Sequence, residues 1–116
     1  MTAQAVDVLP LTVTAAGPLT KHRAVTAAGT HAAADLYGVA KFDASAAGQE
    51  VTVGVLGTSI VEAGAAIAAG TTTVIADAQG RAIPGGTPSA CLGRLVRGQF
   101  ASAPGDKVEV LLCLTV

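Results

Sequence analysis

Apolar side chains recur at every second position in several short runs of this chain. They alternate with small or polar residues in the Val51–Val55 run, and the same alternation extends from Val108 to Val116. A period of two places alternate side chains on one face of a β-strand, so both runs predict strands with a face on a core. The second run also carries Leu111 and Cys113 on its other face, and we expect that strand to be covered on both sides.

Glycine and proline recur too often for long helices, so we expect an all-β fold of short antiparallel strands, as a small barrel or sandwich. The expected strands are Leu11–Ala15, His22–Thr26, Tyr37–Ala40, Glu50–Leu56, Thr58–Glu62, Thr71–Ala76, Cys91–Leu95 and Lys107–Val116. Asp77–Gly80 is typical of a hairpin turn, and Ile83–Pro88 of a loop. A short helix at Ala65–Ala69 or a turn at Thr30–Asp35 is the alternative at those positions.

One stretch of the sequence occurs twice. Residues 44–53 read Ala-Ser-Ala-Ala-Gly-Gln-Glu-Val-Thr-Val, and residues 101–110 read Ala-Ser-Ala-Pro-Gly-Asp-Lys-Val-Glu-Val. Each copy follows a segment that opens with glycine, Gly38–Lys41 before the first and Gly93–Val96 before the second. A strand, a tight glycine turn and a returning strand would produce this pattern. The repeat predicts two similar hairpins, which favours a structural or binding module over an enzyme.

The first residues differ from the rest of the chain. The segment from Met1 to Leu11 is apolar but has few turn signals, and it contains Pro10. Such a terminus is either an edge strand or an arm that becomes ordered on a partner. We therefore divide the chain into an extended N-terminal arm or edge strand, residues 1–11, and a single β domain, residues 12–116.

Composition and charge exclude several classes of partner. With two Phe, one Tyr and no Trp the core is thin, which favours burial against other subunits. The net charge is −1 and the basic residues cluster only at Lys21–Arg23, so we expect no nucleic-acid partner. The apolar segment Ala63–Ala76 is broken by glycine and threonine, so we expect no membrane span. The N-terminus lacks the pattern of a secretory signal, and synthesis in a cytosol is expected.

Reactive side chains are few and scattered. His22 and His31 lie in no triad context, and we expect structural or surface roles for both; the charges of Lys21 and Arg23 would lower the proton affinity of His22. No metal-ligand spacing is present, and the carboxylates are dispersed. Cys91 and Cys113 are expected to be buried thiols, with a disulfide as the alternative. The sequence therefore predicts no catalytic residue and no metal site.

The segment Val61–Gly70 is similar to a corner of biotinyl and lipoyl carrier domains. Those carriers need a cofactor-bearing lysine at a hairpin tip, and none of Lys21, Lys41 and Lys107 lies in a matching context. We therefore expect no cofactor, and a carrier or enzyme fragment is the least favoured class.

Taken together, the motifs resemble the head-stabilising, or capsid cement, decoration proteins of tailed bacteriophages from about Leu11 to Leu112. The residues that carry the resemblance are Tyr37–Ala40, Ala46–Val53, Gly57, the Val61–Gly70 corner, Asp77–Ala82, Leu92–Leu95 and Val108–Leu112. Arg94, Arg97 and the Pro84–Pro88 loop depart from the pattern, which leaves the mode of oligomerisation open.

The resemblance implies a small β-barrel that binds the exterior of a phage capsid and stabilises the expanded head. It implies a homotrimer at local three-fold sites, with the major capsid protein as partner and the virion as location after synthesis in the host cytoplasm. We expect the arm to bind the capsid through Thr2, Val6, Val8, Leu9 and Leu11. The alternative is a small β-barrel binding module for a carbohydrate or another small ligand, although Tyr37, Phe42 and Phe100 are few for stacking.

Overall fold

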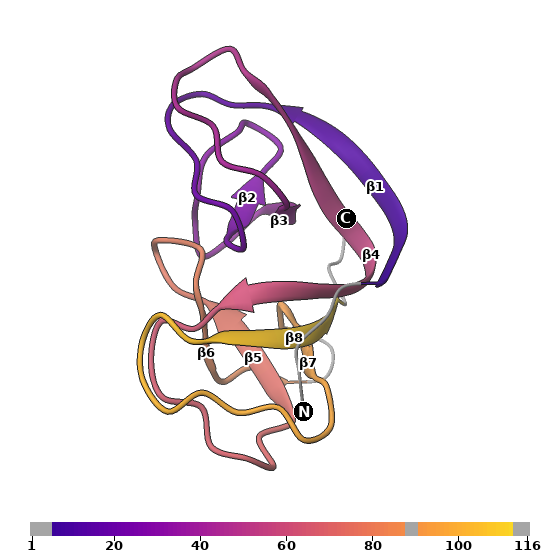
Figure 1. Ribbon diagram of the computed structural model, residues 1–116, viewed down its shortest axis with the longest axis vertical. Helices are drawn as coiled ribbons and strands as arrows, with labels where there is room; N and C mark the ends of the chain where they lie inside the picture. Colours follow the sequence, from indigo (N-terminus) through magenta and orange to yellow (C-terminus); the bar gives the residue numbers. More distant parts are fainter. Residues whose placement is uncertain (1–5, 88–90, 113–116) are drawn as a thin grey trace.

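The computed structural model describes residues 6–87 and 91–112, with the backbone alone for residues 6–9. It contains no helix in these ranges, and its strands form one antiparallel sheet, curled into a half-barrel (Figure 1). The all-β, barrel-like fold is thus confirmed. The strands are β1 (Val6–Thr14), β2 (Ala24–Thr26), β3 (Leu36–Ala40), β4 (Glu50–Glu62), β5 (Thr73–Ala76), β6 (Ala82–Pro84), β7 (Gly93–Leu95) and β8 (Lys107–Leu112).

The long strand β4 organises the sheet. One of its edges carries β1, and the opposite edge carries first β3 and then β8, because Gly54 pairs with both β1 and β3 and Thr58 with both β1 and β8. Gly57 has a φ of 100°, which glycine adopts without strain, and the register of β1 against β4 shifts close to it. The strand therefore bends and runs through both lobes of the molecule (Figure 1).

The two predicted hairpins, β3–β4 and β7–β8, share one register. The equivalent partner pairs are Ala40–Val53 and Leu95–Val110. The next main-chain hydrogen bonds are equivalent too: Lys41 N–H donates to the Thr52 carbonyl at 3.0 Å, and Val96 N–H donates to the Glu109 carbonyl at 3.0 Å. The repeat in the sequence is therefore a repeat in the structure.

The turns inside the hairpins match as well. The N–H of Ser45 donates to Gln49 Oε1 at 2.7 Å, and the N–H of Ser102 donates to Asp106 Oδ2 at 2.8 Å. The glycines of the two turns have positive φ angles of 90° and 97°, Gly48 and Gly105 respectively. In both turns a side chain four residues ahead holds the chain in place.

The equivalence extends beyond the hairpins. Residues 11–14 of β1 pair with residues 50–53 of β4 in the same register in which residues 59–62 of β4 pair with β8. The matching pairs are Thr12–Thr52, Val13–Val51 and Thr14–Glu50 in the first case, and Ile60–Glu109, Val61–Val108 and Glu62–Lys107 in the second. β2 on β3 matches β5 on β7, with the pairs Ala24–Val39 and Thr73–Arg94. We call residues 11–54 unit 1 and residues 59–112 unit 2; β4 belongs to both.

Each unit has a hydrophobic core of small aliphatic side chains. The core of unit 1 consists of Val13, Ala15, Leu19, Val25, Ala40, Ala44, Val51 and Val53. The core of unit 2 includes the equivalent Val61, Ala63, Ile67, Val74, Ala101, Val108 and Val110. The three aromatic residues are absent from both sets of buried residues, so valine, alanine and leucine supply nearly all of the burial.

The units pack head to tail. Ala24 and Val39 of unit 1 are buried in the core of unit 2, at 0% and 1% exposure. The equivalent residues of unit 2 are Thr73 and Arg94, and Arg94 is exposed. Thr73 is buried and bonds the Gly86 carbonyl, so the face that unit 1 buries against unit 2 is exposed on unit 2 at Arg94 but not at Thr73.

Several strand boundaries differ from the predicted ones. Glu50–Leu56 and Thr58–Glu62 are one strand, because Gly57 lets the chain bend without breaking the ladder. The strand expected from His22 begins at Ala24, since His22 has a positive φ of 66°. Ala82–Pro84 is a strand, although Ile83–Pro88 was expected to be a loop.

Three further expectations concern single segments. The possible helix at Ala65–Ala69 is absent, because Ile67 forms a β-bridge with Ala101. The Asp77–Gly80 turn is confirmed: Gly80 N–H donates to the Asp77 carbonyl at 2.9 Å. Leu111 is 47% exposed, so the prediction that β8 is covered on both faces is wrong at this position.

Candidate interaction surfaces

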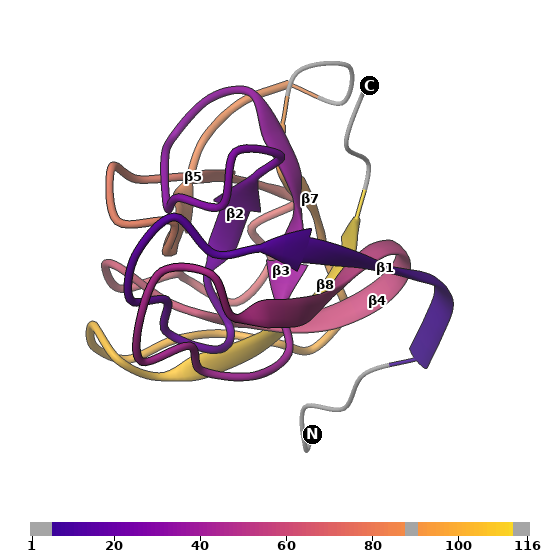
Figure 2. The same ribbon diagram turned by 90° about the horizontal axis from the view of Figure 1, so that it is seen from above.

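The outer edge of β1 is a free strand edge. In the described part of the chain, β1 pairs with β4 alone (Figure 2). Just beyond β1, Ala15 N–H donates to the Gln49 carbonyl, and the Ala15 carbonyl accepts from Gly48 N–H, each at 2.8 Å. Since alternate residues of an antiparallel strand turn their main-chain groups to opposite edges, Thr12 and Thr14 turn theirs away from β4. Just after Thr14 the edge is covered, because Ala16 N–H donates to the Gly29 carbonyl at 3.1 Å. The N–H groups of Thr12 and Thr14 remain able to pair with another strand.

Pro10 lies on the same free edge. Its main chain also faces away from β4 by the same alternation, so its missing N–H removes no bond from the sheet. The register shift between Leu9 and Pro10 bends the strand at this point. Proline and a bulge limit edge-to-edge pairing, so the part of the edge that is open and regular lies after Pro10.

The predicted capsid-binding residues are distributed along this strand. Thr2 lies outside the described residues, and Val6, Val8 and Leu9 lie in β1, described by their backbone alone. Leu11 is half-buried and packs against the core of unit 1. The contact of these residues with a capsid stays a prediction, as does the division of the chain at residue 11.

Two leucines are exposed on the outer face of the sheet. Leu56 in β4 is 50% exposed, and Leu111 in β8 is 47% exposed. Leu56 pairs with Leu9, and Leu111 pairs with Thr58. Both leucines therefore lie at the part of the sheet around the bend of β4 at Gly57.

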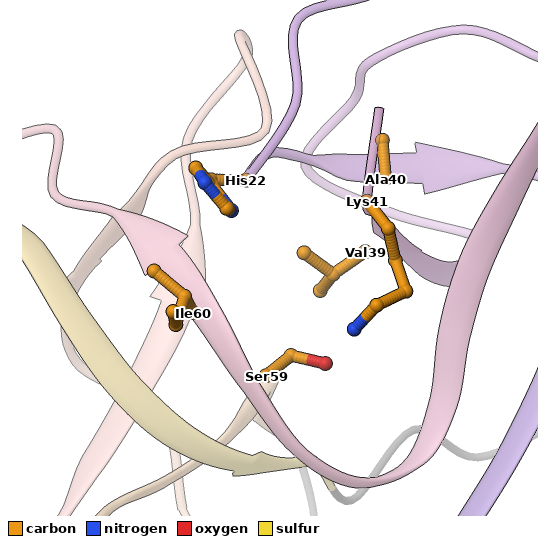
Figure 3. Close-up of a pocket in the computed structure, with 6 residues that line it drawn as sticks. All are labelled: His22, Val39, Ala40, Lys41, Ser59 and Ile60. Carbon is orange, nitrogen blue, oxygen red and sulfur yellow. The ribbon is translucent and has the colours of Figure 1, made fainter. Parts of the chain in front are cut away.

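His22 lines a small pocket at the junction of the two units, the junction pocket. Its other lining residues are Val39, Ala40, Lys41, Ser59 and Ile60 (Figure 3). The pocket has a volume of about 40 Å³, enough for about one or two water molecules. Ser59 Oγ is buried there and has no hydrogen-bond partner among the described residues. A pocket of this size suits a bound water rather than a substrate.

The pKa of His22 is lowered from its ordinary value. Burial of the ring is the largest cause, followed by the positive charges of Lys107 and Lys21 and, more weakly, of Lys41; a hydrogen bond to the Ile60 main chain opposes them. The lowered proton affinity expected from Lys21 and Arg23 is confirmed in direction for Lys21, while Arg23 is not among the causes. The sequence could not show that burial and Lys107, from the other unit, would have the larger effects.

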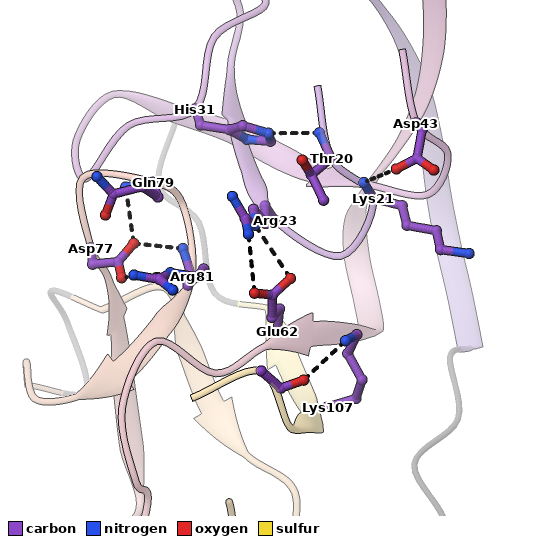
Figure 4. Close-up of polar contacts among 11 residues, drawn as sticks. Thr20, Lys21, Arg23, His31, Asp43, Glu62, Asp77, Gln79, Arg81 and Lys107 are labelled. Atoms are coloured by element: carbon purple, nitrogen blue, oxygen red, sulfur yellow. Dashed lines mark hydrogen bonds and ion pairs between the residues drawn. The ribbon is translucent and has the colours of Figure 1, made fainter. Parts of the chain in front are cut away.

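His31 has a structural role in unit 1. Its Nε2 accepts a hydrogen bond from Thr20 N–H at 2.9 Å, and its Nδ1 donates to the Ala24 carbonyl at 2.9 Å (Figure 4). Both ring nitrogens are thus used to hold two main-chain segments together. The structural role predicted for His31 agrees with this arrangement.

Ion pairs connect the units and hold one hairpin. Arg23 Nη2 lies 3.1 Å from Glu62 Oε2, which joins unit 1 to the end of β4 (Figure 4). Arg81 Nε lies 3.1 Å from Asp77 Oδ2 across the β5–β6 turn. Both pairs are partly buried, and both serve packing.

A second pocket opens on unit 2. It has a volume of about 270 Å³, and we call it the open pocket. Its lining residues are Gly70, Thr71, Thr72, Arg94, Leu95, Val96, Arg97, Gly98 and Gln99. Gln99 is 4% exposed, and its Oε1 accepts from Glu109 N–H at 3.1 Å, while its Nε2 has no partner among the described residues. Sequence reasoning singled out Arg94 and Arg97 but missed Gln99, because a lone glutamine has no local signature.

Other kinds of site find no support in residues 6–87 and 91–112. No group of three or more potential metal ligands occurs in these ranges. No helix there is long and apolar enough to cross a membrane. Cys91 is half-buried, and Cys113 lies outside the described residues. Phe42 and Phe100 are 61% and 55% exposed, and neither lines either pocket.

These features define a small all-β protein of two similar units, whose distinctive parts are a free strand edge, two exposed leucines and an open pocket. Residues 3–112 match the phage cement protein family, and the chain belongs to that family. Membership supports a structural, capsid-associated role in a phage head. No curated protein matches the chain.

A solved structure has a similar fold. It is the crystal structure of the head fiber gp8.5 N base in bacteriophage phi29, with a TM-score of 0.68 and 21% sequence identity. The alignment covers 90% of this chain and 93% of that chain. At this identity the likeness shows the fold, and it extends over both units.

Proposed function

We propose that this protein binds the exterior of a phage capsid and stabilises the expanded head, without catalytic activity and without a cofactor. The observation that carries the proposal is the match to the phage cement protein family over residues 3–112. The binding partner is the major capsid protein, and the protein functions in the virion after synthesis in the host cytoplasm.

The contact with the capsid is made by the N-terminal segment. The segment Thr2–Leu11 ends in an edge strand whose outer side is free in the described part of the chain. An added strand binds through main-chain hydrogen bonds and gains specificity from alternate side chains. Thr2, Val6, Val8 and Leu9 supply these contacts, while Leu11 anchors the segment to the core of unit 1.

The protein acts as a homotrimer at local three-fold positions of the shell. Several weak contacts made together bind more tightly than one, because the first contact raises the effective concentration of the others. The thin aliphatic cores and the exposed Leu56 and Leu111 are consistent with further burial in an assembly.

Co-sedimentation with expanded, undecorated shells of the cognate phage tests the proposal. A variant lacking Thr2–Leu9 removes all four contact residues but keeps Leu11 and the pairing of residues 11–14 with β4, and it should lose most of its binding. Phe42→Ser is the matched control, because it changes an exposed apolar residue, 61% exposed, outside the segment and outside both pockets. Full binding by the deletion variant would remove the arm from the proposal, and failure of the wild type to bind any shell would overturn the function itself.

A further inference from the structure

The junction pocket and the open pocket are the same hollow in two equivalent units. In both, a wall is formed by the end of a short strand and the residue after it: Val39, Ala40 and Lys41 in unit 1, and Arg94, Leu95 and Val96 in unit 2. The main-chain bond from Ala40 N–H to the Arg23 carbonyl has its counterpart in the bond from Leu95 N–H to the Thr72 carbonyl. This match makes Thr71 the equivalent of His22.

Only the hollow of unit 1 is closed. Ser59 and Ile60 of β4 lie over it and leave about 40 Å³, whereas the hollow of unit 2 retains about 270 Å³. Glu62 N–H donates to the His22 carbonyl at 2.7 Å. Unit 2 thus closes the hollow of unit 1 with the outer edge of residues 59–62.

The equivalent edge of unit 1 has no partner strand in the described part of the chain. Residues 59–62 of β4 correspond to residues 11–14 of β1, as the registers show. The N–H groups of Thr12 and Thr14 face away from β4, as Glu62 N–H faces His22. In the described part of the chain, the open pocket of unit 2 therefore has no strand edge over it. The outer edge of residues 11–14 in unit 1 has no pocket beneath it.

We propose that residues 11–14 of a second copy of this chain close the open pocket, in the way that residues 59–62 close the junction pocket. This contact rests on the homo-oligomer of the proposed function and supplies its interface. It leaves the residues before Pro10 free to contact the capsid.

The equivalence specifies the polar contacts of this interface. Thr14 N–H of the incoming copy donates to the Thr71 carbonyl, as Glu62 N–H donates to the His22 carbonyl. Gln99, which is 4% exposed, lines the open pocket beside this contact, and its Oε1 accepts from Glu109 N–H at 3.1 Å.

Charge is complementary at the proposed interface. In the intact junction, Lys107 lies close enough to His22 to lower its pKa. The equivalent of Lys107 is Glu50, which is exposed. Glu50 of the incoming copy therefore approaches the pocket lined by Arg94 and Arg97, neither of which has an ion pair among the described residues.

The two units differ in the connection that follows β3 in unit 1 and β7 in unit 2, next to the open pocket. The connection from Val96 to Ala101 is longer than the equivalent connection from Lys41 to Ala44, and its additional length carries Arg97 and Gln99. A head-to-tail contact between copies is heterologous and gives a finite oligomer only when the rotation closes a ring, as in a cyclic trimer.

The oligomeric state measured by native mass spectrometry and sedimentation tests this contact. Thr14→Pro removes the outward N–H without touching the bonds to β4, and should raise the dissociation constant of the oligomer by about tenfold or more. Thr14→Ala keeps the N–H and is the matched control, which should retain the oligomer. Far-UV circular dichroism and the thermal midpoint verify that both variants fold.

A charge exchange provides the second arm of the test. Glu50→Lys places in unit 1 the residue that unit 2 already has at this position, so the fold accepts it. Glu50→Lys and Arg97→Glu should each weaken the oligomer, and the double variant should restore it. An oligomer that Thr14→Pro and both charge changes leave intact would overturn the interface, and so would a wild-type monomer at shell-binding concentrations.

Shell binding is read separately, so the two proposals fail in different ways. If the wild type binds shells but the variants leave the oligomer unchanged, the proposed interface is wrong and the capsid function stands. If Thr14→Pro dissociates the oligomer but the wild type binds no shell, the proposed interface stands and the capsid function is wrong.

Discussion

Gln49 and Asp106 hold equivalent turns with different side chains. Each accepts the N–H of a serine four residues earlier, at 2.7 Å and 2.8 Å respectively, and Asp106 also accepts Ala103 N–H at 3.3 Å. A carboxylate is a stronger acceptor than a neutral amide oxygen. The same turn is therefore held more firmly in unit 2.

Alanine substitution should reveal this difference. We expect Gln49→Ala to lower the free energy of unfolding by about 0.5 kcal/mol and Asp106→Ala by about 1 kcal/mol, since both turns are exposed to solvent. Urea denaturation at neutral pH measures both values. A larger loss for Gln49→Ala would show that the amide, which also bonds Ser45 Oγ, is the more important contact.

Gly93 is required by the approach of β8. A Cβ at this position would clash with the Leu111 carbonyl oxygen and with Val110 Cγ1, so the strands would have to separate. We expect Gly93→Ala to cost about 2 kcal/mol or more in unfolding free energy. Gly17→Ala is the control, because nothing lies within 4 Å of its added Cβ and its φ is not positive. Equal stability of the two variants would contradict the close approach.

His22 should make stability depend on pH. Burial, and then Lys107, Lys21 and Lys41, lower its pKa below 6.5 in the folded protein. The unfolded chain then binds more protons near and below pH 6.5, so stability is complete above this pH and falls as the pH drops toward the folded pKa. Denaturant midpoints between pH 7.5 and 5 measure the loss.

The variant His22→Asn isolates this contribution, since asparagine tolerates the positive φ of 66° and does not titrate in this range. We expect a shallower decline of stability for His22→Asn than for wild type below pH 6.5, and parallel curves above pH 7. Parallel curves over the whole range would mean that His22 does not contribute.

The Arg23–Glu62 ion pair should couple the two units. Both side chains are partly buried, with exposures of 23% and 14%, and two nitrogen–oxygen contacts of 3.1 and 3.3 Å join them. A double-mutant cycle with Arg23→Ala and Glu62→Ala should give a coupling energy of about 1 kcal/mol, above that of a typical exposed pair. A value near zero would mean that the main-chain bond from Glu62 to His22 holds the junction without help from the side chains.

The sequence predicted the hairpins well because their signals are local. Val51 and Val53 alternate with polar or small residues, which specifies a strand, and the repeated glycine turn specifies its connection to the neighbouring strand. Neither signal depends on the rest of the chain. The repeat itself was visible because the turn chemistry requires particular residues. The repeat also includes β1, β2 and β5, but the sequence does not show this. Equivalent residues in these strands occupy the same place in the sheet without being the same residue type.

The candidate surfaces were less accessible to sequence reasoning. Val39 and Arg94 occupy equivalent places, but one is buried and the other is exposed. Only the packing of unit 1 on unit 2 distinguishes them, and that packing joins segments distant in the chain. Gln99 was missed because a lone glutamine has no local signature, and its bond with Glu109 N–H joins residues ten positions apart.

The strand β4 lines both cores, with Val51 and Val53 in one and Val61 in the other. No cleavage point in the chain therefore leaves two complete folding modules. Removal of one lobe would take away part of β4, on which the core of the other lobe depends. The two cores should therefore unfold in a single calorimetric transition. A shell component fixed from several sides gains from this arrangement, since a pull on either lobe is resisted by the whole molecule.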